Sequence, residues 1–241
     1  MQKARPYILF IGLFAYLIIV LTFVSAKRDE VECKGMRVTV ADAVANAFAD
    51  EGDVVRVVKE RYGDVAGRGI TEIDKDSIER LLVGRSVVKS AQVYYSLDGY
   101  LHIEIRQRKP VLRVLNDDGY YVDEDGRIMP LSHKYTSRVV VATGNVSRKF
   151  ACEELYPFVM VLRNDEFWDA YVEQIVVDGK KEVILIPKVG NFRIVLGGMK
   201  GYEQKMEKLR LFLKKGIARK GWNLYKEINL KFGRQIVCVK K

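Results

Sequence analysis

The chain has 241 residues, of which 49% are hydrophobic and 30% charged, and its formal net charge is +10. This composition excludes a disordered or collagen-like chain, and the length allows one or two folded domains. The positive charge is concentrated at one end, because residues 199–241 hold 13 basic and 3 acidic residues while residues 1–198 hold 28 of each. Such a segment suggests an anionic partner (nucleic acid, a membrane surface or an acidic protein), or else the solvated face of a lysine-rich helix.

An uncharged apolar segment, Tyr7–Val24, lies near the N-terminus. A helix over it is about 27 Å long, close to the thickness of a bilayer core. We therefore expect a transmembrane helix over residues 7–25, after a short cytoplasmic tail (1–6) and before a linker (26–34). Lys3 and Arg5 precede the segment, which favours a cytoplasmic N-terminus and places the remainder outside the cytoplasm. The alternative is a cleaved signal peptide, because "VSA" (residues 24–26) resembles a cleavage site.

Residues 35–109 predict a β-α-α-β-β unit with its helices on one face of the sheet. "GMRVTV" (residues 35–40) is typical of a strand, and residues 50–63 have helical apolar spacing that ends at Gly63. A second helix is expected over residues 74–82, where Asp76 and Glu79 have the spacing of a capping box.

Two runs of alternating apolar residues follow, on either side of Asp98-Gly99. An Asp-Gly pair in this position predicts a hairpin with a type I′ turn. In that hairpin Val93, Tyr95 and Leu97 would face the core from the first strand.

Residues 110–241 predict an antiparallel β domain. Short strand-like segments are separated by "NDDG" and "DEDG" turns, and a helical segment follows in which Pro157 ends or kinks the first turn. A second hairpin, a further strand and an amphipathic helix over residues 202–217 come next. The predicted fold class of the whole chain is thus α+β, with domains at 35–109 and 110–241.

The search for catalytic chemistry finds no convincing site. His102 and His133 have no Ser, Cys or carboxylate at a spacing that suggests a triad or a metal centre. "SVVK" (Ser86–Lys89) matches the S-x-x-K of penicillin-recognising enzymes, but it leads into a strand whereas the motif needs a helix. "DEDG" (residues 123–126) lacks the spacing of a calcium loop. We expect no catalytic residue, no metal and no cofactor.

The cysteines and the aromatic residues add little. Cys33, Cys152 and Cys238 are odd in number and lack metal-ligand spacing, so we expect unpaired thiols, with one oxidised pair left open. A nucleic-acid surface usually interleaves basic and exposed aromatic residues. The aromatic residues near the basic end instead occupy core-like positions, so we expect no nucleic-acid partner.

Five stretches, in this order, carry a family resemblance. They are "ITEIDKDSIERLL" with "VVKSAQVYYSLDGYLHIEIRQRKPVLRV", then "YYVDEDGRIMPLS", "FWDAYVEQIVV", "LIPKVGNFRIVLGG" and "GWNLYKEINLKFGRQIVCVKK". Together with the anchor they make the chain resemble FtsQ/DivIB, a family of bacterial division proteins, in the form found in the Bacteroidetes. Two departures from the family are the short N-terminal tail and Arg85-Ser86, where a proline is expected.

The resemblance implies a single-pass type II protein of the inner membrane with periplasmic domains. It implies that residues 35–109 are a POTRA domain, which docks other division proteins, and that residues 110–241 bind the FtsB–FtsL complex. In the family FtsB adds a strand to the last strand of the sheet. That site maps here onto Phe232, Gly233, Arg234, Gln235, Ile236, Val237, Cys238 and Val239.

The terminal residues "EINLKFGRQIVCVKK" support an edge strand on their own pattern. Ile228, Leu230 and Phe232 share one parity, and Arg234 breaks it. We therefore predict a hairpin of residues 227–232 and 235–239 around a two-residue II′ turn at Gly233-Arg234, with the last strand at the sheet edge.

The sequence thus favours a non-catalytic membrane scaffold that recruits partners by strand addition and has no small-molecule substrate. The alternatives are a cell-envelope enzyme, supported only by "SVVK", and a secreted or anchored envelope-assembly factor.

Overall fold

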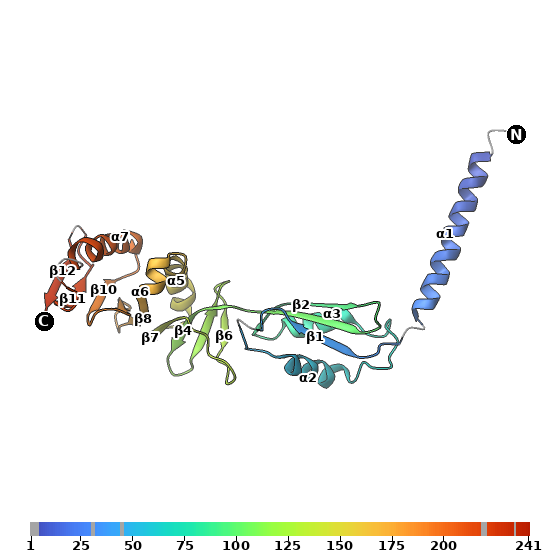
Figure 1. Ribbon diagram of the computed structural model, residues 1–241, viewed down its shortest axis with the longest axis horizontal. Coiled ribbons are helices and arrows are strands. Elements are labelled where there is room, and N and C mark those ends of the chain that lie inside the picture. The colour runs from blue at the N-terminus through green and yellow to red at the C-terminus, as the bar shows by residue number, and fades with distance from the viewer. Residues whose placement is uncertain (1–4, 30–31, 44–45, 218–220, 234) are drawn as a thin grey trace. The chain divides into compact units, whose positions relative to one another are not determined.

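The computed structural model describes residues 5–29, 32–43, 46–217, 221–233 and 235–241. The chain divides into two compact units, residues 1–107 and residues 108–241 (Figure 1). The first holds a long helix and a small α/β sheet, and the second is built on one large sheet.

The first helix, α1, runs from Arg5 to Asp29, and its described side chains (residues 10–22) are exposed. Among the residues that the structure describes, no helix combines the length and the apolar character that a membrane span requires. The anchor at 7–25 stays a prediction.

The rest of the first unit has the predicted β-α-α-β-β order. It comprises β1 (Met36–Val40), α2 (Glu51–Tyr62), α3 (Lys75–Val83), β2 (Val88–Tyr95) and β3 (Leu101–Gln107). The sheet order is β1-β3-β2, with β1 parallel and β2 antiparallel to the central β3. One core unites side chains of both helices with alternate residues of the strands, such as Val58, Ile78 and Ile103.

The capping of the two helices differs from the prediction. The capping box is on α2, where the side chains of Asp50 and Asp53 accept from each other's backbone N–H. On α3 the cap is Asp74, whose carboxylate accepts from the N–H and the hydroxyl of Ser77. The predicted box of Asp76 and Glu79 is wrong, because the helix begins two residues earlier and Glu79 turns to β2, where it accepts from the Val93 N–H at 2.7 Å.

The turn between β2 and β3 is also corrected. Strand pairing ends at Tyr95 and Leu101, and Gly99 has a φ of 85° while Asp98 does not have a positive φ. The loop is therefore longer than the two-residue type I′ turn, which needs positive φ at both central residues. As a consequence Leu97 leaves the strand, and its side chain is fully exposed instead of facing the core.

The second unit is a nine-stranded sheet in the order β12-β11-β10-β9-β8-β7-β4-β5-β6. Its strands are β4 (Pro110–Leu115), β5 (Tyr120–Asp123), β6 (Ile128–Pro130), β7 (Val140–Gly144), β8 (Val172–Val177), β9 (Val183–Pro187), β10 (Arg193–Gly197), β11 (Tyr225–Asn229) and β12 (Val237–Lys240). The sheet is mixed, not antiparallel as predicted, because β4–β7, β7–β8 and β10–β11 are parallel pairs. Parallel neighbours need long crossovers, and the helices of this unit supply two of them.

The first of these helical crossovers, between β7 and β8, contains α4 (Arg148–Phe150), the π-helix η2 (Ala151–Leu155), α5 (Tyr156–Arg163) and α6 (Glu166–Tyr171). Pro157 lies in the first turn of α5, two residues after the π-helix ends at Leu155. The helix thus changes from π to α close to the residue whose ring and missing N–H interrupt regular helical bonding. The second crossover, between β10 and β11, contains α7 (Tyr202–Phe212) and η3 (Leu213–Ile217). The apolar face of the amphipathic helix predicted over residues 202–217 is formed by Met206, Leu209 and Leu213. These residues are buried in the same core as Phe158 and Ile194.

Candidate partner-binding edge

The last strand, β12, is an edge of the large sheet. It pairs antiparallel with β11, and β11 pairs in turn with β10, so the other side of β12 has no neighbouring strand among the residues that the structure describes (Figure 1). This is the arrangement predicted for the terminal hairpin. An edge strand presents backbone donors and acceptors to which another chain can pair.

The backbone register identifies which groups of β12 are free for pairing. Leu230, just after β11, donates its N–H to the carbonyl of Val195 in β10. Backbone groups of successive residues point to opposite sides of a strand, so those of Glu227 and Asn229 point away from β10 and toward β12. There they meet Val239 and Val237. The alternate residues of β12, Cys238 and Lys240, must therefore direct their N–H and C=O groups to the free side of the strand. At the end of the chain Lys241 again faces inward and donates its N–H to Leu224.

The two faces of β12 differ in chemistry. Ile236 and Cys238 pack against the core of the second unit. Val237 and Val239 point to the other face, where 38% and 48% of their surface is exposed. The edge thus offers two apolar side chains beside its free backbone groups, which is what strand addition uses for affinity and specificity.

The connection between β11 and β12 is longer than predicted. β11 ends at Asn229 and β12 begins at Val237, and Gly233 does not have the positive φ that a II′ turn with glycine first requires. The two-residue turn is therefore wrong, and Phe232 lies in the connection with 47% of its surface exposed. Gly233 and Gln235 are exposed as well, whereas Arg234 lies outside the described residues.

Two lysines hold this connection. The ammonium group of Lys208, on α7, donates to the carbonyl oxygens of Phe232 at 3.0 Å and Gly233 at 2.8 Å. The ammonium group of Lys231 contacts both carboxylate oxygens of Glu182, at 2.7 and 2.9 Å. The aliphatic part of the Lys231 side chain lies over Gly197. A Cβ at position 197 would lie 2.8 Å from the Cγ of Lys231, so only glycine leaves room for this contact. The connection is thus fixed by side chains far away in sequence.

The electrostatics around the edge are basic. Lys226, Lys231, Lys240 and Lys241 are exposed. Burial, together with the neighbouring charge of Lys208, lowers the pKa of Lys205, which donates to the carbonyl oxygens of Leu196 and Gly198. Burial also raises the pKa of the Cys238 thiol, so this thiol stays protonated at neutral pH and serves as an apolar side chain.

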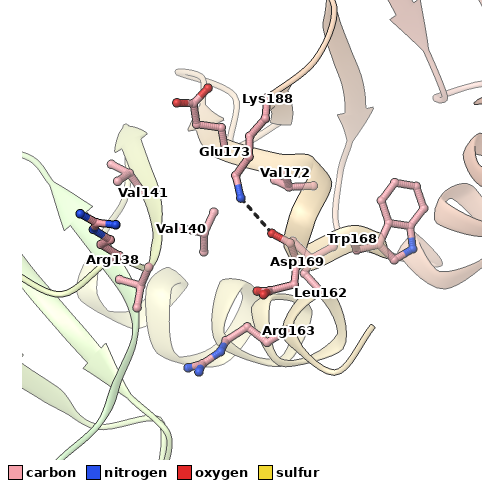
Figure 2. Close-up of a pocket in the computed structure, with 11 residues that line it drawn as sticks. Arg138, Val140, Val141, Leu162, Arg163, Trp168, Asp169, Val172, Glu173 and Lys188 are labelled. Atoms are coloured by element: carbon pink, nitrogen blue, oxygen red, sulfur yellow. Dashed lines mark hydrogen bonds between the residues drawn. The ribbon is translucent and has the colours of Figure 1, made fainter. Parts of the chain in front are cut away.

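A pocket of about 470 Å³ lies elsewhere in the second unit, beside the first residues of β7 and β8 (Figure 2). The two strands pair only from Val141 and Gln174 onward, and the residues before this point line the pocket. Its walls mix apolar side chains with charges of both signs. The Lys188 ammonium group, drawn in Figure 2, donates to the backbone carbonyl of Asp169 at 3.1 Å, and Arg163 donates to that of Pro110. Both of these cations therefore donate to backbone carbonyl oxygens, and the described residues that line the pocket form no cluster of three or more potential metal ligands.

The sequence motifs considered for catalysis lie apart from one another. Ser86 is in a turn and Lys89 in β2, so they do not share a helix face as the S-x-x-K chemistry requires. His102 stacks on Tyr94, and His133 is exposed in a loop. The three cysteines are free, and the described residues contain no cluster of three or more potential metal ligands.

Comparison with protein families matches both units. Residues 109–239, more than half of the chain, match the family described as FtsQ/DivIB, C-terminal related. The chain belongs to the FtsQ/DivIB family. Residues 31–106 match the POTRA-like domain, which supports the same membership. No curated protein matches the chain. As an FtsQ/DivIB protein, it has the cell-division scaffold role of a family that is generally non-enzymatic.

The FtsQ/DivIB match ends at Val239, so the matched region includes the first three residues of the edge strand β12. The sequence predicted this strand and its place at the sheet edge, and the structure shows both. The assignment of residues 232–239 to partner binding was implied by the family resemblance and stays a prediction. Sequence patterns missed Lys208 and Glu182, which hold the connection. No local signal could have found either residue, because the contacts span 24 and 49 positions of sequence.

Proposed function

We propose that this FtsQ/DivIB protein is a non-catalytic, single-pass scaffold of the division machinery. Its N-terminus is cytoplasmic, residues 7–25 anchor it in the inner membrane, and both folded units lie in the periplasm. The second unit recruits an FtsB–FtsL-type complex by strand addition to β12, and the POTRA-like domain docks other division proteins.

The observation that carries the partner proposal is the free side of β12. Cys238 and Lys240 offer backbone N–H and C=O groups there, and Val237 and Val239 offer apolar contacts next to them. A partner segment in extended conformation would continue the sheet beyond β12. The surrounding lysines favour acidic side chains on that segment, chiefly by raising the association rate.

The exposed positions of the hairpin support a surface role. Phe232 has almost half its surface exposed although it is aromatic and follows the buried Leu230. Substituting such a residue removes no core contact of the size that buried Ile228 makes, so binding and folding can be tested separately.

The experiment measures the affinity of the membrane-embedded full chain for the purified FtsB–FtsL complex. Deletion of residues 235–241 and, separately, Val239→Glu should each abolish or greatly weaken binding. Asn223→Glu, at an exposed position just before β11, is the matched control for added negative charge. Undiminished affinity after the deletion would overturn the edge-strand proposal. Loss of the folded state in Val239→Glu, measured by circular dichroism, would show that this side chain has a structural role instead.

A further inference from the structure

The tip of the β2–β3 hairpin carries the most exposed large apolar side chain in the described structure. Leu97 has a relative exposure of 108%, so it contacts nothing within its own unit. Gly99 donates its N–H to Ser96 across the turn at 3.0 Å, and Gly99 has a φ of 85°. The turn is therefore well fixed, and it holds the leucine away from the surface.

This tip lies at the end of the sheet where the chain enters from α1. Lys34 donates its backbone N–H to Gly99 at 2.8 Å and its ammonium group to the Asp98 carbonyl at 2.7 Å. Leu101 donates its N–H to Gly35 at 2.9 Å, and β1 and β3 start together from there. The loop that contains Arg68 belongs to the same end, because Cys33 donates its N–H to the Arg68 carbonyl.

The chain length between α1 and the tip is short. Lys34 is five residues beyond Asp29, the last residue of α1. Five extended residues reach at most about 18 Å, so Lys34 cannot lie farther than this from the end of the helix. The tip adds only the short reach from Lys34 to Asp98 and Gly99, to which Lys34 is hydrogen-bonded. The polar layer on each side of a bilayer core is roughly 5–8 Å thick. If α1 is anchored in a bilayer, the tip is thus confined to the neighbourhood of the membrane surface.

The side chains around Leu97 are those that suit the polar–apolar boundary of a bilayer. Tyr100 is half-buried, with the Arg37 guanidinium 4.0 Å from its ring centroid and the Lys34 ammonium 6.0 Å away. Tyrosine and long cations gather at this boundary because each combines an apolar body with a polar end.

We propose that the β2–β3 tip is a membrane-contact site in which Leu97 inserts into the interfacial layer of the bilayer that holds α1. Tyr100, Lys34 and Arg37 lie beside it at headgroup level. This inference rests on the proposed anchoring of residues 7–25 and deepens it, because a second contact restricts how the POTRA-like domain turns about its linker.

The charges at this end indicate that the contact is mainly apolar. Exposed Lys34, Arg37 and Arg68 are offset in part by Asp98, which pairs with Arg37 at 2.6 Å, and by exposed Glu32. The net charge of these five residues is only +1. We therefore expect the contact to depend weakly on anionic lipid and on salt, unlike one made by a polybasic segment.

The test places a tryptophan at the tip of the full chain, as Leu97→Trp, in phosphatidylcholine vesicles with and without brominated acyl chains. The native Trp168 and Trp222 belong to the second unit, and wild-type protein supplies their signal for subtraction. Ser86→Trp is the matched control, because Ser86 is also exposed but lies just before β2, at the opposite end of the sheet. Carbonate-resistant flotation of the wild-type chain with the vesicles measures anchoring independently.

The site is supported if the tryptophan at position 97 emits at shorter wavelength than that at position 86 and loses intensity with brominated lipid while the control does not. If the chain floats but position 97 is not quenched, the contact site is wrong and the anchor stands. Equal quenching at positions 97 and 86 also overturns the proposed contact site, because the membrane contact would not be specific to the tip. Failure to float overturns both the anchor and the contact.

Discussion

Lys208 on α7 holds the backbone of Phe232 in the terminal hairpin, donating to its carbonyl oxygen at 3.0 Å. The same ammonium group reaches the Gly233 carbonyl at 2.8 Å. A helix of the crossover between β10 and β11 thereby fixes the connection that precedes the edge strand. This contact fixes the segment from which the edge strand β12 continues.

Removing this contact should loosen the connection without unfolding the unit. Lys208→Ala removes two charge-assisted hydrogen bonds, and bonds to a charged group contribute about 1.5–3 kcal/mol each when they are sheltered. Lys208 is half-exposed, so we expect the loss of stabilisation of the connection to be near the lower of these figures. It should be seen as faster hydrogen exchange in residues 230–240 and as about tenfold weaker partner binding.

Lys214→Ala is the control for the loss of one positive charge, because Lys214 is exposed and follows α7 directly. It should leave exchange in the hairpin unchanged. Equal exchange in both variants would show that Lys208 does not hold the connection.

A buried ion pair fixes the start of the second unit. The Arg108 guanidinium lies 2.9 Å from the Asp123 carboxylate, and Asp123 has no exposed surface. The carboxylate also accepts from the N–H groups of Asp125 and Arg127. Asp123→Ala removes the carboxylate from Arg108 and leaves the Asp125 and Arg127 N–H donors without their acceptor. At about 1–3 kcal/mol for each such donor, we expect a loss of about 2–5 kcal/mol.

Urea unfolding followed by tryptophan fluorescence measures this loss, because both tryptophans report on the second unit. Asp118→Ala is the control, since the Asp118 carboxylate is exposed and forms only a loose surface pair with Arg148, at 3.8 Å. A change below about 1 kcal/mol in Asp123→Ala, typical of a surface pair, would contradict the prediction.

Acid should weaken the contact between α6 and α7. The hydrogen bond from Arg210 holds the pKa of Asp165 below its ordinary value of 3.8, although burial acts in the opposite direction. Because the folded pKa is the lower one, the stabilisation is present above pH 3.8 and is lost as the pH falls through the folded value. In Arg210→Met the pKa of Asp165 should rise toward 3.8.

Carboxyl NMR titration of Asp165 measures this shift. Arg163→Met, which removes a cation two residues before Asp165, should leave the titration in place. An unchanged Asp165 pKa in Arg210→Met would assign the shift to the backbone donors of Phe167 and Trp168 instead.

Local patterns predicted the elements well where the determinants are local. The alternation around β3 and the spacing of Val54 and Val58 placed a strand and a helix correctly, because burial of one face is enough to set the period. The prediction that Leu97 faces the core was wrong. Leu97 continues the alternation of Val93 and Tyr95, but the strand ends at Tyr95 and the turn begins at Ser96.

Strand partnership could not be predicted in the same way. Nothing in the segment "RIVLG" indicates that β10 pairs in parallel with β11 across an entire helix, so the sequence predicts an antiparallel sheet where the structure has a mixed one. The edge strand could be predicted because residues 227–239 combine alternating apolar residues with a break in parity at Arg234. Its role in partner binding stays a prediction. Its support by Lys208 depends on a contact between distant residues, which a single sequence does not encode locally.

The register of β12 gives the most direct test of strand addition. The N–H of Lys240 points to the free side, whereas that of Val239 points to β11. Proline lacks this N–H, so Lys240→Pro removes one donor from the proposed partner and leaves the ladder with β11 intact. Lys240→Ala removes the charge alone.

The measurement is the affinity of the full chain for the FtsB–FtsL complex in these two variants, with folding checked by circular dichroism. We predict that Lys240→Pro weakens binding at least about tenfold, the cost of an unmade buried hydrogen bond, while Lys240→Ala changes it only slightly. Equal affinities in a folded Lys240→Pro protein and in Lys240→Ala would contradict strand addition at β12.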